Sequence, residues 1–203
     1  MKLLVNNPPP HPDCMDFVQP RSFNAIGKTC MWAADNDAFA NFCPTAYLKM
    51  LDRIAAQESR PQFVTIPDVV GCSGKTYDLF EKWIHELQDR NIPAAYVLQN
   101  GVDDHWFYHI NQGYHFPFDE VDAFFIGGDT AFKFTEWVRD FISVASGMHG
   151  KWIHMGRVNS VKRLNYARMI GVDSCDGSGM ARFRRSVLVP MLRALDQQVM
   201  HLA

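Results

Sequence analysis

The sequence lacks the features that mark several classes of protein. No C-x-x-C pair occurs, and the cysteines are odd in number and widely scattered, which argues against a disulfide framework and a zinc cluster. They are Cys14, Cys30, Cys43, Cys72 and Cys175. No apolar run reaches the length of about 18 residues that suggests a membrane span. The short apolar run at residues 3–5 gives way at once to Asn-Asn-Pro-Pro-Pro, so no signal peptide is expected. We expect a soluble, cytoplasmic protein without membrane association.

A strong net charge is also missing, but the charges are unevenly distributed. The chain carries a net charge of -2. Residues 1–150 hold 11 Lys and Arg against 19 Asp and Glu, whereas residues 151–203 hold 9 against 3. This basic last part predicts either a surface that binds phosphates or a solvated helix surface that balances the acidic part.

What the sequence does have is a repeated order of short apolar runs and amphipathic stretches. The runs cover residues 29–34, 63–66, 94–98, 123–126, 152–155 and 171–174. The stretches cover residues 44–58, 76–90, 133–146, 161–170 and 182–198. A strand-then-helix order favours a parallel sheet. With 47% hydrophobic residues, we expect one α/β domain over residues 1–203, with residues 3–5 and 187–189 as candidates for a first and a last strand.

Polar and glycine residues follow these predicted strands. In parallel α/β folds, the loops after the strands meet at one end of the sheet and form the active site. Six of the segments at these places also resemble, in the same order, the substrate-pocket motifs of tRNA-guanine transglycosylases. They are residues 34–39 (ADNDAF), 66–68 (IPD), 97–101 (VLQNG), 125–128 (FIGG), 154–156 (HMG) and 171–176 (GVDSCD).

The short chain is more similar to the phage-type DNA branch of this family. The resemblance implies a TIM-like (β/α)8 barrel, compact and irregular, without the family's zinc subdomain, because the C-x-C-x-x-C motif and its downstream His are absent. It further implies a glycosyltransferase that exchanges guanine in DNA, with tRNA as the less favoured substrate, for a free 7-deazaguanine base such as preQ0. No cofactor or metal is implied. A phage enzyme would act in the cytoplasm of an infected bacterium; the oligomeric state stays open.

By this resemblance, Asp176 is the nucleophile that forms a covalent aspartyl-sugar intermediate, as carboxylates do in retaining glycosidases. Asp35 is the second carboxylate, which moves protons on the departing and incoming bases. Without the resemblance, Asp176 before Gly177 is typical of a turn, and Asp35 is typical of a cap or turn.

The resemblance also implies a pocket that reads and sandwiches the base. A carboxylate, an amide and a closely approaching backbone N–H would form hydrogen bonds with the edge of guanine. A flat ring and a thioether would stack on the two faces of the base. The residues are Phe39, Asp68, Gln99, Gly127, Gly128 and Met155. Taken singly, each is also compatible with ordinary loop or core packing.

Basic residues near these motifs are candidates for holding the phosphate backbone while a base is turned out of the strand. The predicted nucleic-acid-binding residues are these basic residues and one asparagine, namely Lys133, Arg157, Asn159, Lys162, Arg163, Arg182, Arg184 and Arg185.

Other functions remain open at this point. An N-glycosylase would hydrolyse the same intermediate with water, and a non-enzymatic binder of nucleic acid or nucleobase would need neither carboxylate. The segment at residues 71–76 lacks the first glycine of a P-loop, so we interpret it as the start of a helix near Thr76. The aromatic segment with His105, His109 and His115 is compatible with a packed lid, with substrate contact or with a metal site.

Overall fold

The chain forms one closed barrel of eight parallel strands. The structure, a computed structural model, describes residues 1–20, 31–103 and 116–199. The strands are β1 (Lys2–Val5), β2 (Cys14–Val18), β3 (Trp32–Ala34), β4 (Val64–Thr65), β5 (Ala94–Leu98), β6 (Ala123–Ile126), β7 (Trp152–Met155) and β8 (Ser174–Asp176). They pair in sequence order, and β8 closes on β1 with Leu4 opposite Asp176. The predicted TIM-like barrel is confirmed.

The first of the two candidate strands is confirmed and the second is wrong. Residues 3–5 lie in β1, but residues 187–189 belong to two consecutive helical segments. The missing strand is β2, which the apolar pattern did not reveal because Asp16 interrupts a short run. All five β2 residues are buried, since a barrel strand has the interior on one face and the helices on the other.

The last strand begins later than predicted. Gly171, with φ of +88°, follows α7 in the left-handed conformation that glycine adopts easily. Val172 then packs in the core and Asp173 accepts a hydrogen bond from the Ile153 N–H at 2.8 Å. The strand therefore covers Ser174–Asp176, and Asp176 is its last residue.

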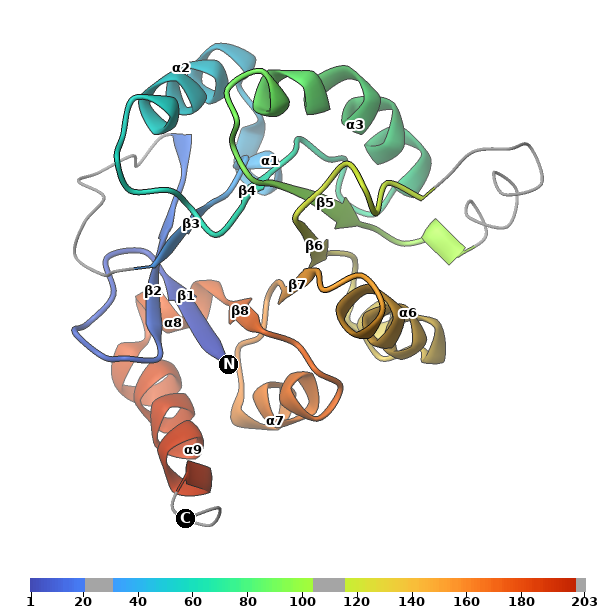
Figure 1. Cartoon of the computed structure of the whole chain (residues 1–203). Helices are drawn as coiled ribbons and strands as arrows, with labels where there is room; N and C mark the ends of the chain where they lie inside the picture. The colour runs from blue at the N-terminus through green and yellow to red at the C-terminus, as the bar shows by residue number, and fades with distance from the viewer. Residues whose placement is uncertain (21–30, 104–115, 200–203) are drawn as a thin grey trace.

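Helices surround the barrel (Figure 1). They are α1 (Ala38–Asn41), α2 (Pro44–Ala55), α3 (Ser73–Gln88), α5 (Thr130–Lys133), α6 (Glu136–Gly147), α7 (Val161–Met169), α8 (Ser178–Arg182), the π-helical η2 (Arg184–Leu188) and α9 (Val189–Val199). The predicted helix at 133–146 begins later, as α6 at Glu136, because Thr135 caps it, its hydroxyl accepting from the Val138 N–H. Lys133 instead ends the short α5. The helix after residue 71 begins at Ser73, and Thr76 instead donates to the Cys72 carbonyl.

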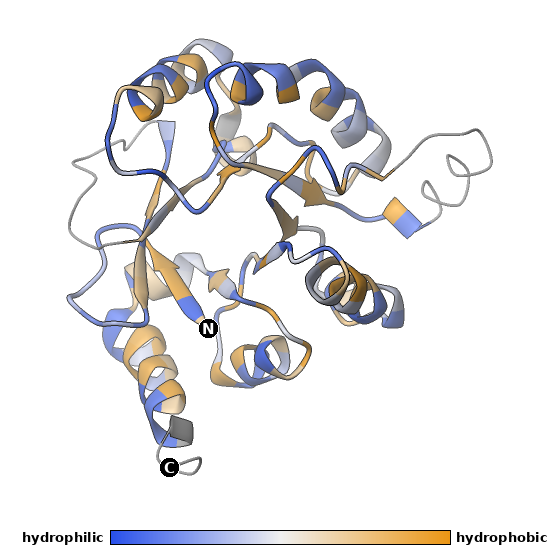
Figure 2. Cartoon of the chain, viewed as in Figure 1, coloured by the Kyte–Doolittle hydropathy of each residue, from blue (hydrophilic) through white to orange (hydrophobic). Residues whose placement is uncertain are grey.

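Two apolar clusters hold the barrel in place. One fills the barrel interior, with Leu4, Met15, Phe17 and Phe63 among its members, and the other fills the layer between the strands and the helices. The helices accordingly turn apolar residues toward the strands and polar residues outward (Figure 2). Among the described helices, none combines the length and the apolarity that a membrane span requires.

Candidate active site

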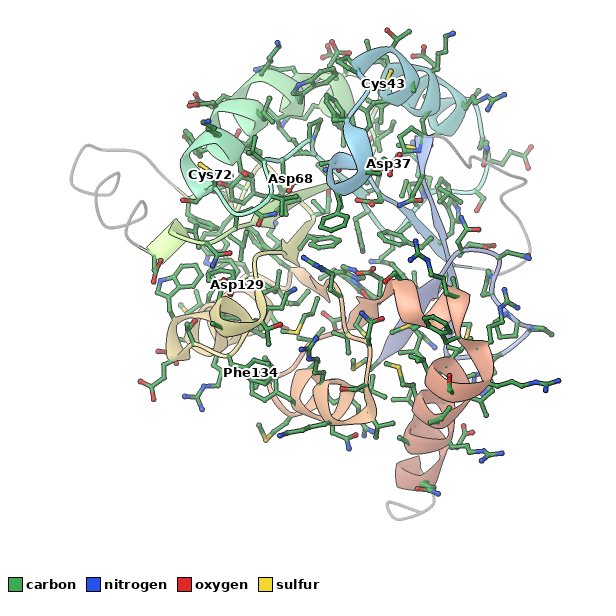
Figure 3. All side chains as sticks on the ribbon, turned by 180° about the vertical axis from the view of Figure 1, so that it is seen from behind. Asp37, Cys43, Asp68, Cys72, Asp129 and Phe134 are labelled. Atoms are coloured by element: carbon green, nitrogen blue, oxygen red, sulfur yellow. The ribbon has the colours of Figure 1, made fainter. Side chains whose placement is uncertain are left out.

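A cavity of about 470 Å³ opens at the carboxyl-terminal ends of the strands, which is a typical size for a small-molecule pocket. Figure 3 labels Asp37, Asp68 and Asp129, which lie around the middle of the view on the loops after β3, β4 and β6. Among the predicted site residues, those lining the cavity are Asp35, Phe39, Asp68, Gln99, Gly127, Gly128, Lys133, Arg157, Asp176 and Arg182. Loops distant in sequence thus converge on one site.

Asp176 presents one carboxylate oxygen to this cavity. Its Oδ1 lies 3.2 Å from the His154 Nε2 and accepts a weaker hydrogen bond from the Arg157 N–H at 3.3 Å. Its Oδ2 makes no hydrogen bond to any residue within the described ranges. The side chain is 20% exposed. A carboxylate that is fixed through one oxygen and open through the other is arranged as an oxygen nucleophile.

His154 is a site residue that the sequence did not reveal. It is fully buried inside the barrel, packed against Phe17, Phe63 and Phe125. The Trp152 indole N–H donates to the Ser174 Oγ at 2.8 Å, and that Oγ lies 2.9 Å from the His154 Nδ1. Because an indole is only a donor, the serine hydrogen is available to Nδ1, and Nε2–H then donates to Asp176.

Asp35 follows β3 in a very different environment. Its Oδ1 accepts from the Thr65 hydroxyl at 3.2 Å and from the Asn36 N–H at 2.9 Å, and its Oδ2 accepts from the Gln19 amide at 3.2 Å. Burial, and then the negative charge of Asp176, raise the pKa of Asp35 to about 7. Near neutral pH this carboxyl group exists in both forms, which suits a group that gives and takes a proton.

Asp68 and Gln99 form a connected polar wall with the backbone of Gly128. The Gln99 Nε2 donates to the Asp68 Oδ2 at 2.7 Å, and the Gln99 Oε1 accepts from the Gly128 N–H at 2.8 Å. Asn36 donates to the other Asp68 oxygen at 2.8 Å. Burial raises the pKa of Asp68. Hydrogen bonds thus link every member of the wall, and the Gly128 N–H, expected to face a base, is bonded to Gln99.

Two glycines allow this wall to form. A Cβ atom on Gly127 would lie 2.7 Å from the Gln99 Nε2, so a side chain there would displace the amide. Gly128 has φ of +65°, and a Cβ would lie 2.5 Å from the Phe132 ring. Both positions therefore require glycine for close packing, and their contribution to the site is to place Gln99.

Phe39 and Arg157, and not Phe39 and Met155, form a stacked pair at the cavity. The Arg157 guanidinium lies over the Phe39 ring at 4.6 Å from its centroid. The Phe39 side chain is 69% exposed. Met155 is buried in the layer outside the barrel and does not line the cavity. Strand alternation explains this result, because His154 and Gly156 point inward and Met155 between them points outward.

The other predicted nucleic-acid-binding residues divide into three groups. Lys162, Arg182 and Arg185 are exposed, and Arg182 lines the cavity. Arg163 donates to the Thr130 hydroxyl at 3.3 Å, and Arg184 donates to the Asn7 carbonyl at 2.5 Å. Asn159 instead accepts from the Gly179 N–H at 2.8 Å and thereby holds the chain just after the nucleophile candidate.

The predicted aromatic segment with His105, His109 and His115 lies outside the described residues. Within the described ranges, no group of three His, Cys, Asp or Glu residues is placed to hold a metal ion. No protein-family model and no curated protein matches this sequence.

Proposed function

We propose that this protein is a DNA-guanine transglycosylase that exchanges guanine for a 7-deazaguanine base through a covalent aspartyl-sugar intermediate. The observation that carries the proposal is that two carboxyl groups with different environments line one cavity. Asp176 has an open oxygen, and Asp35 has a pKa raised to about 7. Such a difference separates a nucleophile from a proton carrier. The segments that resemble the transglycosylase motifs also supply the polar groups that are expected to bind a guanine-type base.

The proposed reaction has two balanced halves. The Asp176 Oδ2 attacks C1′ of the deoxyribose, the bond from C1′ to N9 breaks, and guanine leaves with a proton from the Asp35 carboxyl group. In the second half, N9 of the incoming base gives its proton to the Asp35 carboxylate and attacks C1′, and the bond to Asp176 breaks. The proton and the nucleophile are both regenerated, so the exchange needs no further reactant.

The polar wall and the stacked pair fit a guanine-type base. Asp68 would accept from the N1–H and the 2-amino group, and the second hydrogen of the Gln99 amide would face the 6-carbonyl oxygen. The ring of Phe39 would stack on one face of the base, and the Arg157 guanidinium would cover the other. A base can enter between Phe39 and Arg157 only when the contact between these two side chains opens.

A nucleic acid is the favoured substrate because exposed cations lie beside the cavity. Arg157 and Arg182 line the cavity, and Lys162 and Arg185 are exposed on neighbouring segments. Cations beside a base pocket hold the phosphates of the strand while the target base is extruded. The absence of the zinc motif of the tRNA enzymes from the sequence favours DNA over tRNA.

The test is incorporation of a labelled base. The protein is incubated with DNA or tRNA and labelled 7-cyano-7-deazaguanine, and the label in the denatured polymer is counted. We expect label in DNA only and its loss in Asp176→Asn. Asp140→Asn, which changes an exposed carboxylate on α6, is the matched control. Abasic sites without incorporation would replace the proposal with an N-glycosylase, and binding without any chemistry would replace it with a binder.

A further inference from the structure

Lys133 occupies a position that the phosphate-binding interpretation does not explain. It is the last residue of α5, its side chain is only 7% exposed, and it lines the cavity. Its Nζ donates to the Gly128 carbonyl at 3.2 Å. Within the described ranges, no carboxylate oxygen lies within ion-pair distance of this Nζ, and the ammonium group has two further hydrogens.

A buried ammonium group without an adjacent counter-ion is costly. Burial lowers the pKa of Lys133 to about 8, although the charges of Asp176 and Asp129 oppose this effect. The energetic cost falls when a bound molecule supplies an acceptor to the unused hydrogens. The placement therefore indicates a ligand group that Lys133 meets inside the cavity, since a phosphate on the strand outside would contact an exposed cation.

A chain of hydrogen bonds fixes where that group lies. Asp68 bonds to Gln99 at 2.7 Å, Gln99 bonds to the Gly128 N–H at 2.8 Å, and the Gly128 carbonyl bonds to Lys133 at 3.2 Å. A guanine-type ring offers its edge groups in the order 2-amino, N1–H, 6-carbonyl and position 7. When Asp68 takes the first two and Gln99 takes the carbonyl, position 7 comes next along the wall, on the side of Lys133.

We propose that Lys133 is the specificity-determining residue that selects a base with a neutral hydrogen-bond acceptor at position 7. A nitrile or carboxamide at this position would accept from the ammonium group. A cationic aminomethyl group would be repelled by it and would bring no acceptor. The departing guanine has an acceptor, N7, on the same side, so one lysine serves both bases of the exchange. This inference rests on the proposed function, because it takes the cavity to be a guanine-type base pocket.

The test measures binding of three free bases by calorimetry, which needs no transfer. They are 7-deazaguanine, its 7-cyano derivative and its 7-aminomethyl derivative. The wild type should bind the cyano base about 10- to 100-fold tighter than 7-deazaguanine, the range for a hydrogen bond to a charged group. It should bind the aminomethyl base more weakly than 7-deazaguanine.

Two variants keep the test independent of a folding defect. Lys133→Met should remove the preference for the cyano base and leave the affinity for 7-deazaguanine within about twofold of wild type, because that base offers Lys133 no acceptor. Lys133→Gln keeps a neutral donor, so it should retain part of the cyano preference and relieve the rejection of the aminomethyl base. Lys82→Met, which removes an exposed cation on α3 away from the cavity, should change neither ratio.

The possible failures are distinguishable. If Lys133→Met lowers affinity for all three bases equally, or if the wild type does not discriminate among them, the role of Lys133 is structural and the proposal is overturned. If the wild type binds none of the bases, the proposal also fails. If the bases bind with the expected order and no label enters DNA, the selection by Lys133 stands and the transglycosylase reaction is what fails.

Discussion

The two ends of the barrel use aspartate in opposite ways. At the amino-terminal end, Asp122 accepts from the Ala94 N–H at 2.9 Å and Asp173 accepts from the Ile153 N–H at 2.8 Å. Each carboxylate thus joins its own strand to the start of the preceding one. At the carboxyl-terminal end, Asp35, Asp68 and Asp176 line a cavity and bond largely to side chains. The first arrangement stabilises the fold, and the second places carboxyl groups at the end of the barrel where barrels of this class have their active sites.

Among the aspartates at the two ends of the barrel, substitution of Asp176 should have the largest effect on base exchange. Asp176→Asn should reduce base exchange by at least about a thousandfold, because an amide oxygen is a poor nucleophile toward C1′. The variant should still fold, since its Oδ1 can accept from His154 as before. Exchange kinetics and thermal unfolding measured together check this. Exchange within tenfold of wild type would remove Asp176 from the reaction.

Asp35→Asn should reduce exchange by about 10² to 10⁴-fold, the usual range for general acid-base catalysis. It should also change the pH dependence of stability. With a pKa of about 7 in the folded state, the native protein binds more protons than the unfolded chain between about pH 4 and 7. The free energy of unfolding therefore falls as pH rises through this interval.

For Asp35 alone, this fall is on the order of 2 to 4 kcal/mol. Asp35→Asn should flatten the fall without abolishing it, because the pKa of Asp68 is raised as well. Urea unfolding at pH 5 and pH 8 measures the change. If wild type and variant show the same pH dependence, Asp35 has an ordinary pKa and the proton-carrying role loses its support.

His154 should have an intermediate effect as a positioning residue for Asp176. His154→Phe keeps a ring against Phe17 and Phe63 but loses the hydrogen bond to the carboxylate. We expect kcat to fall about 10- to 100-fold, in line with the loss of a hydrogen bond to a charged group, with unchanged affinity for the free base. His154→Gln, which retains a donor, should restore part of kcat. An equal loss of kcat and base affinity in both variants would indicate a collapsed pocket instead.

The amino-terminal end should show the smallest effect on activity and a clear effect on stability. Asp173→Ala leaves the Ile153 N–H without its acceptor, which costs about 1 to 3 kcal/mol of unfolding free energy. Exchange activity at a temperature where the variant is folded should equal that of wild type. If Asp173→Ala has normal stability and reduced exchange, the aspartates of the amino-terminal end do not act on stability alone and this assignment is wrong.

Local patterns in the sequence predicted a parallel sheet, and the resemblance to the transglycosylase motifs implied the closed barrel and most of the residues that line the cavity. Apolar runs marked six strands, and polar residues after them marked the site. It did not reveal β2, where Asp16 interrupts a five-residue strand, and it placed a strand at 187–189 where an amphipathic helix continues. These choices depend on which neighbours cover each face, and that information is not local.

Met155 and Lys133 lie elsewhere than the motifs indicated. Met155 was chosen from its motif, although strand alternation alone would have placed His154 and Gly156 on the inner face. Lys133 was predicted to hold the phosphate backbone because it is a basic residue close to one of the motifs. Only the short turn of α5, which brings its ammonium group back to the Gly128 carbonyl, shows that it lies inside the cavity.

The covalent role of Asp176 is tested most directly by trapping the intermediate. Wild type and Asp176→Asn are incubated with guanine-containing DNA without any added base, denatured, digested and examined by mass spectrometry. We expect a DNA adduct on the wild-type peptide that contains Asp176, released by added 7-cyano-7-deazaguanine and absent from the variant. An adduct on another residue, or exchange that proceeds without any adduct, would contradict it.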